Sequence, residues 1–323
     1  MHTKAELYRE ALRQTASDRQ RAVTLAQRRR QAAVAAIPEL EPLEDEIRGL
    51  GLRLVQLSAQ GAEEEALAEA RRQRAGAEER LAGLLAQNGY GPGSLEPAYS
   101  CPVCKDTGTV DGRMCPCVGR RARKLRRAEI AAASPLSLCD FDSMELRYYP
   151  DEADEATGEN IRAQMAETLA FLRNYAEHFD LKSTNLLLWG NAGLGKTHAA
   201  LAIARTVLDK GFDAVYICAQ ELFGQLERER FSDDSPLLEA VLEADLLVLD
   251  DLGTEYVSPY VLSCFYNILN TRLLEKRPTV YTTNIVDGKV YEARYTEKIA
   301  SRLVGSCEAV PFLGRDIRKL KNM

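Results

Sequence analysis

The sequence has no long apolar run and no excess of positive charge. None of its hydrophobic stretches approaches the roughly 18 residues that a membrane-spanning helix needs. Residues 1–30 are highly charged and contain no apolar segment of the kind found in a secretory signal peptide. The formal net charge is −6, so any nucleic-acid contact must come from local basic patches. We therefore expect a cytoplasmic protein without a membrane segment.

Cysteine is scarce outside one short segment. Four of the eight cysteines form what we call the cysteine cluster: Cys101, Cys104, Cys115 and Cys117. The others, Cys139, Cys218, Cys264 and Cys307, are scattered at apolar or strand-like positions, and we expect them to be ordinary core residues. A metal site accompanied by free thiols is typical of a reducing compartment.

The cysteine cluster has the spacing C-x2-C followed by C-x-C, with ten residues between the pairs. Four thiolates can close a tetrahedral shell around Zn²⁺ at about 2.3 Å each. The intervening residues 106–112 predict a tight hairpin, whose path Gly108 and Gly112 permit. The pattern favours a structural zinc knuckle over a redox pair.

Composition predicts three parts in the chain. Residues 1–90 are rich in strong helix formers with apolar residues at helical spacing, and we expect two or three long helices folded back as an antiparallel coiled coil. This arm is either a spacer or a docking site for a protein partner. Residues 91–134 hold the zinc knuckle and a basic helix, and residues 135–323 form an ATPase domain.

The basic helix of the middle part has no acidic residue between Arg120 and Arg127. Its cations are Arg120, Arg121, Arg123, Lys124, Arg126 and Arg127. Such a run either contacts DNA phosphates or an acidic partner, or forms a solvated helix face.

The third part alternates short apolar strands with helical patterns. The strands are predicted at residues 185–189, 214–218, 245–250 and 279–283, after a helix at 159–179. This alternation predicts an α/β fold with a parallel sheet between helices.

A phosphate-binding loop follows the first of these strands. The segment fits the pattern G-x-x-x-x-G-K-T and leads directly into a helical run. Backbone N–H groups and the helix N-terminus can hold the phosphates of ATP, and the lysine can reach the β- and γ-phosphates. The predicted nucleotide-binding residues are Gly190, Asn191, Ala192, Gly193, Leu194, Gly195, Lys196, Thr197 and His198, of which His198 is expected to pack rather than to catalyse.

Two carboxylates end the strand at 245–250. Asp250 is the expected Mg²⁺ partner beside Thr197, and Asp251 is the candidate that polarises the attacking water. Glu255 is a second candidate for that base, and Asp251 could instead only cap the local backbone. Because aspartate is shorter than the glutamate of many ATPases, we expect slow or partner-dependent hydrolysis.

Polar residues further along the chain complete the predicted site. Asn284 ends the strand at 279–283 and is expected to orient the attacking water, unless it only starts a turn. Arg302, Arg315 and Arg318 are candidates for the arginine that stabilises charge on the γ-phosphate, or for surface ion pairs.

Five segments together carry a family resemblance. They are GNAGLGKTH, DLLVLDDLGTE, PTVYTTN, IASRLVGSCE and FLGRDIR, all between residues 160 and 323. The chain resembles AAA+ ATPases of the DnaC/DnaI type, the bacterial replicative helicase loaders, and the IstB transposition helpers share most of these motifs. The resemblance implies that Arg302 acts on the ATP of a neighbouring subunit and that Arg318 senses ATP within its own subunit.

The resemblance also implies partners. Members assemble as ATP-dependent homo-oligomers, bind single-stranded DNA, and deliver a hexameric replicative DNA helicase; DnaI-type loaders carry an N-terminal zinc module that engages the helicase. Residues 220–231 occupy the place that contacts DNA, with Phe223 and Phe231 as stacking candidates and Arg228 and Arg230 as phosphate contacts. A transposition helper and a nucleotide-gated adaptor without turnover are the alternatives.

Overall fold

The computed structural model describes residues 1–134, 139–155, 158–231 and 235–321, and for residue 321 the backbone alone. The chain forms two compact units: residues 1–11 together with 116–323, and residues 12–115. Among the described residues, no helix combines the length and the apolar character that crossing a membrane demands.

The larger unit is built on a parallel sheet of five strands in the order β4-β5-β6-β3-β7. The strands are β3 (Asn185–Trp189), β4 (Ala214–Cys218), β5 (Leu246–Leu252), β6 (Thr279–Thr283) and β7 (Cys307–Pro311). The predicted α/β class is confirmed. Strand β7 was not predicted, because this edge strand mixes polar and small residues and buries little beyond Val310.

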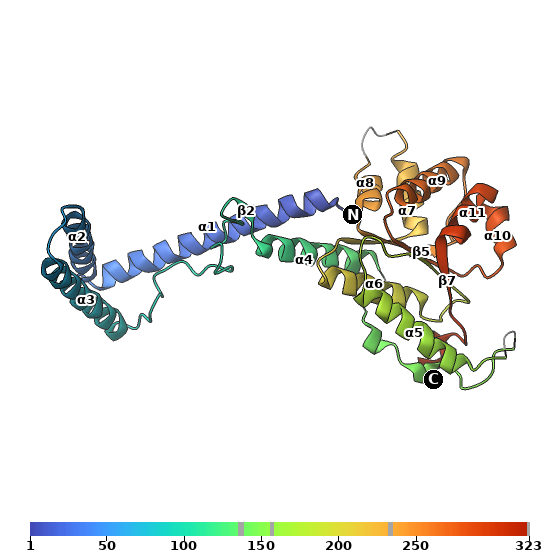
Figure 1. Cartoon of the computed structure of the whole chain (residues 1–323), viewed down its shortest axis with the longest axis horizontal. Helices are drawn as coiled ribbons and strands as arrows, with labels where there is room; N and C mark the ends of the chain where they lie inside the picture. The colour runs from blue at the N-terminus through green and yellow to red at the C-terminus, as the bar shows by residue number, and fades with distance from the viewer. Residues whose placement is uncertain (135–138, 156–157, 232–234, 322–323) are drawn as a thin grey trace. The chain divides into compact units, whose positions relative to one another are not determined.

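Helices cover both faces of this sheet (Figure 1). One face carries α4 (Pro116–Ala133), α5 (Ile161–Glu177) and α6 (Lys196–Asp209). The other carries α7 (Ala219–Arg228), α8 (Pro236–Glu243), α9 (Pro259–Leu274), α10 (Gly288–Tyr295) and α11 (Glu297–Ser306). Short helices η1 (Phe141–Ser143), η2 (Leu146–Tyr148) and α12 (Ile317–Lys321) complete the unit.

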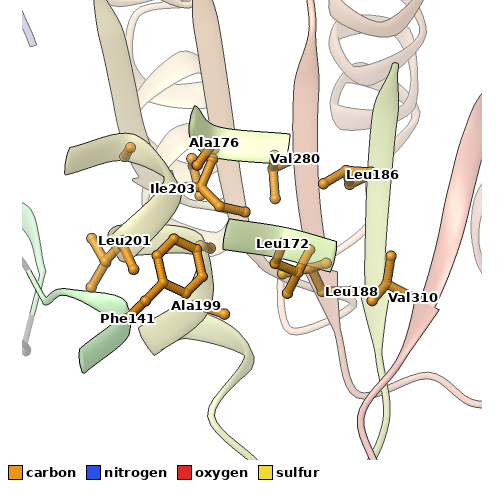
Figure 2. Close-up of a cluster of buried hydrophobic side chains, with 14 of the residues drawn as sticks. Phe141, Leu172, Ala176, Leu186, Leu188, Ala199, Leu201, Ile203, Val280 and Val310 are labelled. Atoms are coloured by element: carbon orange, nitrogen blue, oxygen red, sulfur yellow. The ribbon is translucent and has the colours of Figure 1, made fainter. Parts of the chain in front are cut away.

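Alternation along the strands divides the core into two layers. Leu186 and Leu188 of β3 point into the layer with α5 and α6, while Leu187 points into the layer with α7 and α9. Figure 2 shows the first layer, in which Leu172 of α5 faces the strands. The sheet is thus buried on both sides, as its continuous apolar strands require.

The start of the chain packs on the larger unit. Thr3 and Glu6 cap α1 (Lys4–Ala36) reciprocally, since each side chain accepts a hydrogen bond from the backbone N–H of the other. Lys4 Nζ donates to Asp245 Oδ2 at 2.9 Å. Helix α4 also belongs to this unit, since the second boundary between the compact units falls between residues 115 and 116.

The smaller unit contains the rest of α1, α2 (Leu40–Ala59), α3 (Glu64–Gln87) and a hairpin of β1 (Thr109–Val110) and β2 (Arg113–Met114). Helices α2 and α3 lie side by side (Figure 1). Ile37 and Leu40 are buried against Leu81, Leu84 and Leu85. The helices that the sequence predicts over residues 1–90 are therefore present, with the pairing concentrated between α2 and α3.

Candidate nucleotide-binding site

The phosphate-binding loop joins β3 to α6 and depends on three glycines with positive φ. These are Gly190 (142°), Gly193 (80°) and Gly195 (95°). A side chain would also collide with neighbours, because a Cβ on Gly190 would lie 2.3 Å from the carbonyl oxygen of Phe312. The segment that follows β7 is therefore fitted closely against this loop.

The loop forms one wall of a cavity of about 510 Å³. Three further segments contribute to it: the ends of β5 and β6, residues 143–149, and the start of α12. Its lining residues are Ser143, Met144, Glu145, Tyr148, Tyr149, Ala192, Gly193, Leu194, Gly195, Lys196, Thr197, His198, Asp250, Asp251, Asn284, Ile317 and Arg318. The carboxyl ends of neighbouring parallel strands are where ligands bind in α/β folds.

Lys196 is the main cation inside this cavity, and its side chain is held in place. Its Nζ donates to the carbonyl oxygens of Gly190 at 2.8 Å and Asn191 at 2.7 Å, and to Oδ1 of Asn284 at 2.8 Å. Burial lowers the pKa of Lys196 to about 8, although Asp251 and Asp250 oppose this shift. The ammonium donates all three of its N–H groups to these oxygens, so a phosphate that binds Lys196 must replace at least one of them.

Asp250 accepts hydrogen bonds from three hydroxyl groups. Thr197 Oγ1 lies 3.0 Å from its Oδ1, Thr282 Oγ1 lies 2.5 Å from the same oxygen, and Tyr216 donates to Oδ2 at 2.7 Å. Burial, then Asp250 itself, raises the pKa of Tyr216, which keeps that hydroxyl a donor. The carboxylate and Thr197 together offer the oxygen ligands that Mg²⁺ prefers.

Asp251 is directed into the cavity by a backbone irregularity. The register between β5 and β6 shifts between Leu249 and Leu252, and Asp251 has a φ of 52°. A bulge of this kind re-aims a side chain, and a hydrogen bond from the Asp251 N–H to Thr282 Oγ1 (2.9 Å) holds it. Burial, then the neighbouring Asp250, raises the pKa of the Asp251 carboxyl.

Glu255, the alternative base, lies elsewhere. It is buried, and its carboxylate accepts hydrogen bonds from the Gly253 N–H at 2.9 Å and from the Tyr295 hydroxyl. Arg294 Nε lies 3.5 Å from the same group. These contacts link the loop after β5 to α10 and leave Glu255 outside the lining of the cavity.

The three candidate arginines have different surroundings. Arg318 lines the cavity. Arg315 forms an ion pair with Glu152 at 2.9 Å. Arg302, on α11, places its guanidinium 4.9 Å from the ring centre of Tyr266, and it is not among the residues that line this cavity.

Residues 143–149 line the cavity although the sequence does not predict a role for them. Tyr149 donates its hydroxyl to the Leu194 carbonyl at 2.9 Å, and Ser143 Oγ lies 2.8 Å from His198 Nε2. Met144 and Tyr148 add apolar surface to the cavity. No local motif marks these residues, and the Tyr148-Tyr149 pair before Pro150 is the one signal that could have drawn attention to them.

The prediction that Phe223 stacks on DNA bases is wrong. Phe223 is 1% exposed and packs edge-on against Phe265 in the core. Phe231 is 93% exposed, and Arg230 lies 5.5 Å from the centre of its ring. The amphipathic pattern of α7 explains the error, because one face of this helix must cover the sheet.

The basic run on α4 is also partly internal. Arg126 is fully buried, with Nε 2.9 Å and Nη2 3.0 Å from the two carboxylate oxygens of Asp213. Arg127 pairs with Asp209. Because Val118, Ala122 and Ile130 share the buried face with Arg126, this arginine contributes to packing and cannot contact DNA, whereas Arg127 forms a half-exposed ion pair.

The cysteine cluster converges in space as its spacing predicts. The four Sγ atoms lie within 4.8 Å of one another, and those of Cys101 and Cys115 are 3.9 Å apart. A tetrahedral Zn²⁺ site with Zn–S distances of about 2.3 Å requires sulfur separations of about 3.8 Å. The geometry therefore fits Zn²⁺.

A local hairpin brings the cysteine pairs together. Asp111 and Gly112 have φ values of 50° and 74°, which are typical of the two-residue turn that joins β1 to β2. Asp106 accepts hydrogen bonds from the N–H groups of Ser100 at 2.7 Å and Cys101 at 2.9 Å. The predicted hairpin is confirmed.

Comparisons with known proteins agree with this geometry. The model of the family described as IstB-like ATP binding protein matches residues 119–323. The replicative helicase loader DnaC of Escherichia coli K12 is 30% identical over 132 residues, covering 39% of this chain and 54% of DnaC. The phage-like element PBSX protein XkdC of Bacillus subtilis is 26% identical over 228 residues, covering 65% of this chain and 80% of XkdC.

The chain thus spans about half the length of DnaC, the first curated relative. An ATP-binding protein of insertion sequence IS232 from Bacillus thuringiensis is 26% identical over 139 residues, covering 42% of this chain and 55% of that protein. Among solved structures, the DnaC helicase loader gives a TM-score of 0.44 at 24% identity, covering 52% of this chain and 99% of that one.

Proposed function

The chain belongs to the family of IstB-like ATP-binding proteins, and we propose that it is an ATPase that loads a replicative DNA helicase onto single-stranded DNA. The observation that carries the ATPase part is the cavity in which Lys196, Thr197, Asp250 and Asp251 converge. The loader part rests on the similarity to DnaC. The proposal places the protein in the cytoplasm.

Within the cavity, the residues divide the work of phosphoryl transfer. The N–H groups of the phosphate-binding loop and Lys196 hold the triphosphate. Thr197 and Asp250 would hold Mg²⁺, which neutralises charge on the phosphates when bound. Asp251 accepts a proton from the attacking water and Asn284 orients that water, since both line the same cavity.

The arginines act from two sides in this proposal. Arg318 contacts the terminal phosphate within its own subunit, because it lines the cavity. Arg302 contacts the ATP of a neighbouring copy, which makes a complete site dependent on an ATP-bound homo-oligomer. An arginine at the γ-phosphate is worth about 10³- to 10⁵-fold in rate where it has been measured.

Asp251→Asn is expected to separate binding from hydrolysis. The amide keeps the size of the side chain but cannot accept the proton, so steady-state hydrolysis should fall at least about a hundredfold while ATP affinity changes little. Measurement requires single-stranded DNA as an activator, with Glu255→Gln as the comparison. Unchanged turnover in Asp251→Asn would show that the base lies elsewhere.

The affinity for ATP is expected to decrease as the pH rises through about 8. Lys196 binds the phosphates in its protonated form, and burial lowers its pKa to about 8. Bound ATP raises the pKa of Lys196. The affinity for ATP is therefore full below about pH 8 and is lost progressively as the pH rises above this value. Titrations between about pH 7 and about pH 9.5 test this. Lys196→Arg should flatten the dependence, and a wild-type affinity that is constant over that range contradicts the assignment.

Helicase loading is tested by direct interaction. The purified chain with ATP and Mg²⁺ should co-purify with the hexameric replicative helicase of its own organism. Loading of that helicase onto a circular single strand should then require ATP. A sensitive binding assay that detects no complex would rule out the loader function while leaving the ATPase intact.

A second function has its own support. The relative from insertion sequence IS232 and the IstB-like family model favour a transposition helper that delivers target DNA to a transposase. A transposase gene beside this one would support that role. A nucleotide-gated adaptor with negligible hydrolysis is the outcome if Asp251→Asn and the wild type have equally low turnover.

The cysteine cluster is proposed to hold a structural Zn²⁺ that organises residues 101–117. Its four sulfur atoms leave no open coordination position for catalysis. The adjoining hairpin offers a compact surface for a protein partner, and in this proposal that partner is the helicase.

A further inference from the structure

Asp316 lies directly against the phosphate-binding loop. A Cβ added to Gly193 would come within 1.8 Å of Asp316 Oδ1, and the N–H of Ile317 donates to the Gly193 carbonyl at 2.9 Å. The glycine is therefore required at this position because an acidic side chain occupies the adjacent space. An acidic group so close to a loop that binds phosphates is unexpected, because the two negative charges repel each other.

The same carboxylate holds Arg318. Nε of Arg318 lies 3.0 Å from Oδ1 of Asp316, and Nη2 lies 3.0 Å from Oδ2. The backbone N–H of Arg318 also donates to Oδ1 at 3.1 Å. This two-point geometry is the strongest way for a guanidinium to bind a carboxylate. The hydrogen bonds from Arg318 also lower the pKa of the Asp316 carboxyl, so it is charged at neutral pH.

Arg318 cannot use these two N–H groups for a phosphate and for Asp316 at once. It lines the cavity together with Lys196 and Asp251, so a terminal phosphate is within the space it faces. The side chain of Asp316 is 22% exposed and that of Arg318 is 69% exposed, so the pair is partly screened by solvent and can exchange. A terminal phosphate that binds the Nε–Nη2 edge of the guanidinium must displace the carboxylate, whereas ADP has no terminal phosphate that competes for this edge.

We propose that Asp316 is a specificity-determining residue that competes with the terminal phosphate for Arg318 and so lowers the affinity for ATP relative to ADP. The inference rests on the proposed function, in which Arg318 binds the terminal phosphate. Without a nucleotide, Arg318 therefore stays bound to Asp316. Binding of ATP, but not of ADP, then changes the contacts of the segment around α12.

Asp316→Asn tests the competition while keeping the shape of the side chain. The ratio of the ADP dissociation constant to the ATP dissociation constant should rise by about two- to fivefold, the range for an exposed ion pair. Calorimetric titration with Mg²⁺ present measures both constants. The rise should shrink at high salt, and it should vanish when Asp316→Asn is combined with Arg318→Ala.

Asp151→Asn is the matched control, because Asp151 forms an exposed ion pair with Arg162 outside the cavity lining and should leave the ratio unchanged. Thermal unfolding checks that each variant folds. If the Asp316→Asn variant does not fold, Asp316→Ser takes its place. Equal gains for ATP and ADP, or a fall in the ratio, would overturn the competition. Wild-type protein that binds neither nucleotide would instead refute the proposed function.

Discussion

Lys196→Ala is expected to weaken ATP binding on the order of a hundredfold and to abolish hydrolysis. The substitution removes the ammonium that is proposed to hold the β- and γ-phosphates, and a hydrogen bond to a charged group is worth about 1.5–3 kcal/mol. Asn284 loses its partner as well, since its Oδ1 accepts from Lys196 at 2.8 Å. Titration with ATP and Mg²⁺ and a steady-state phosphate-release assay measure the two effects.

The fold should survive this substitution. The folded-state pKa of Lys196, about 8, lies below its ordinary value of 10.5, so the charged ammonium is disfavoured by burial at neutral pH. Relief of this burial cost offsets the loss of the three hydrogen bonds from Lys196, so the thermal midpoint should change little. Lys210→Ala is the matched control, because Lys210 follows the same helix and binds the carbonyls of Glu177 and Phe179. Undiminished ATP binding by Lys196→Ala would refute the assignment of the cavity.

Cys104→Ser is expected to eliminate bound zinc and to unfold the knuckle. The four Sγ atoms of the cluster lie within 4.8 Å of one another, and among the described residues no disulfide joins them. Structural Zn²⁺ supplies about 10–16 kcal/mol of apparent binding free energy in small zinc domains, which is more than such a short hairpin could replace. The zinc content per chain, measured by elemental mass spectrometry, should fall from one to zero.

Limited proteolysis gives a second measure of this change. Lys105 and Arg113 lie in the cluster's loop, and trypsin should cut there in Cys104→Ser or after chelation but not in the zinc-loaded wild type. ATP affinity should stay unchanged, because no cysteine of the cluster lines the nucleotide cavity. Cys264→Ser, outside the cluster, should keep its zinc. Zinc-free wild type with an intact, protease-resistant hairpin would contradict the metal site.

Local sequence predicted the parts of the site that a short stretch of chain builds by itself. The loop at residues 190–197 needs glycines at fixed positions between a strand and a helix, and β3, β4 and the first part of β5 are short, mainly apolar runs. The cysteine hairpin likewise closes within 17 residues. In each case the backbone conformation is decided by neighbours in the sequence, so composition and spacing are sufficient.

The sequence therefore determined the nucleotide loop, the carboxylates after β5 and the metal-binding pattern. Tertiary structure alone decided that residues 143–149 line the cavity, that Glu255 turns toward Tyr295, and that Phe223 enters the core. It also brought Asp316 against Gly193, more than 100 residues away. The physical reason is that packing between distant segments selects which face of each element is buried, and residue type cannot distinguish an arginine or phenylalanine that packs inside from one that meets a ligand.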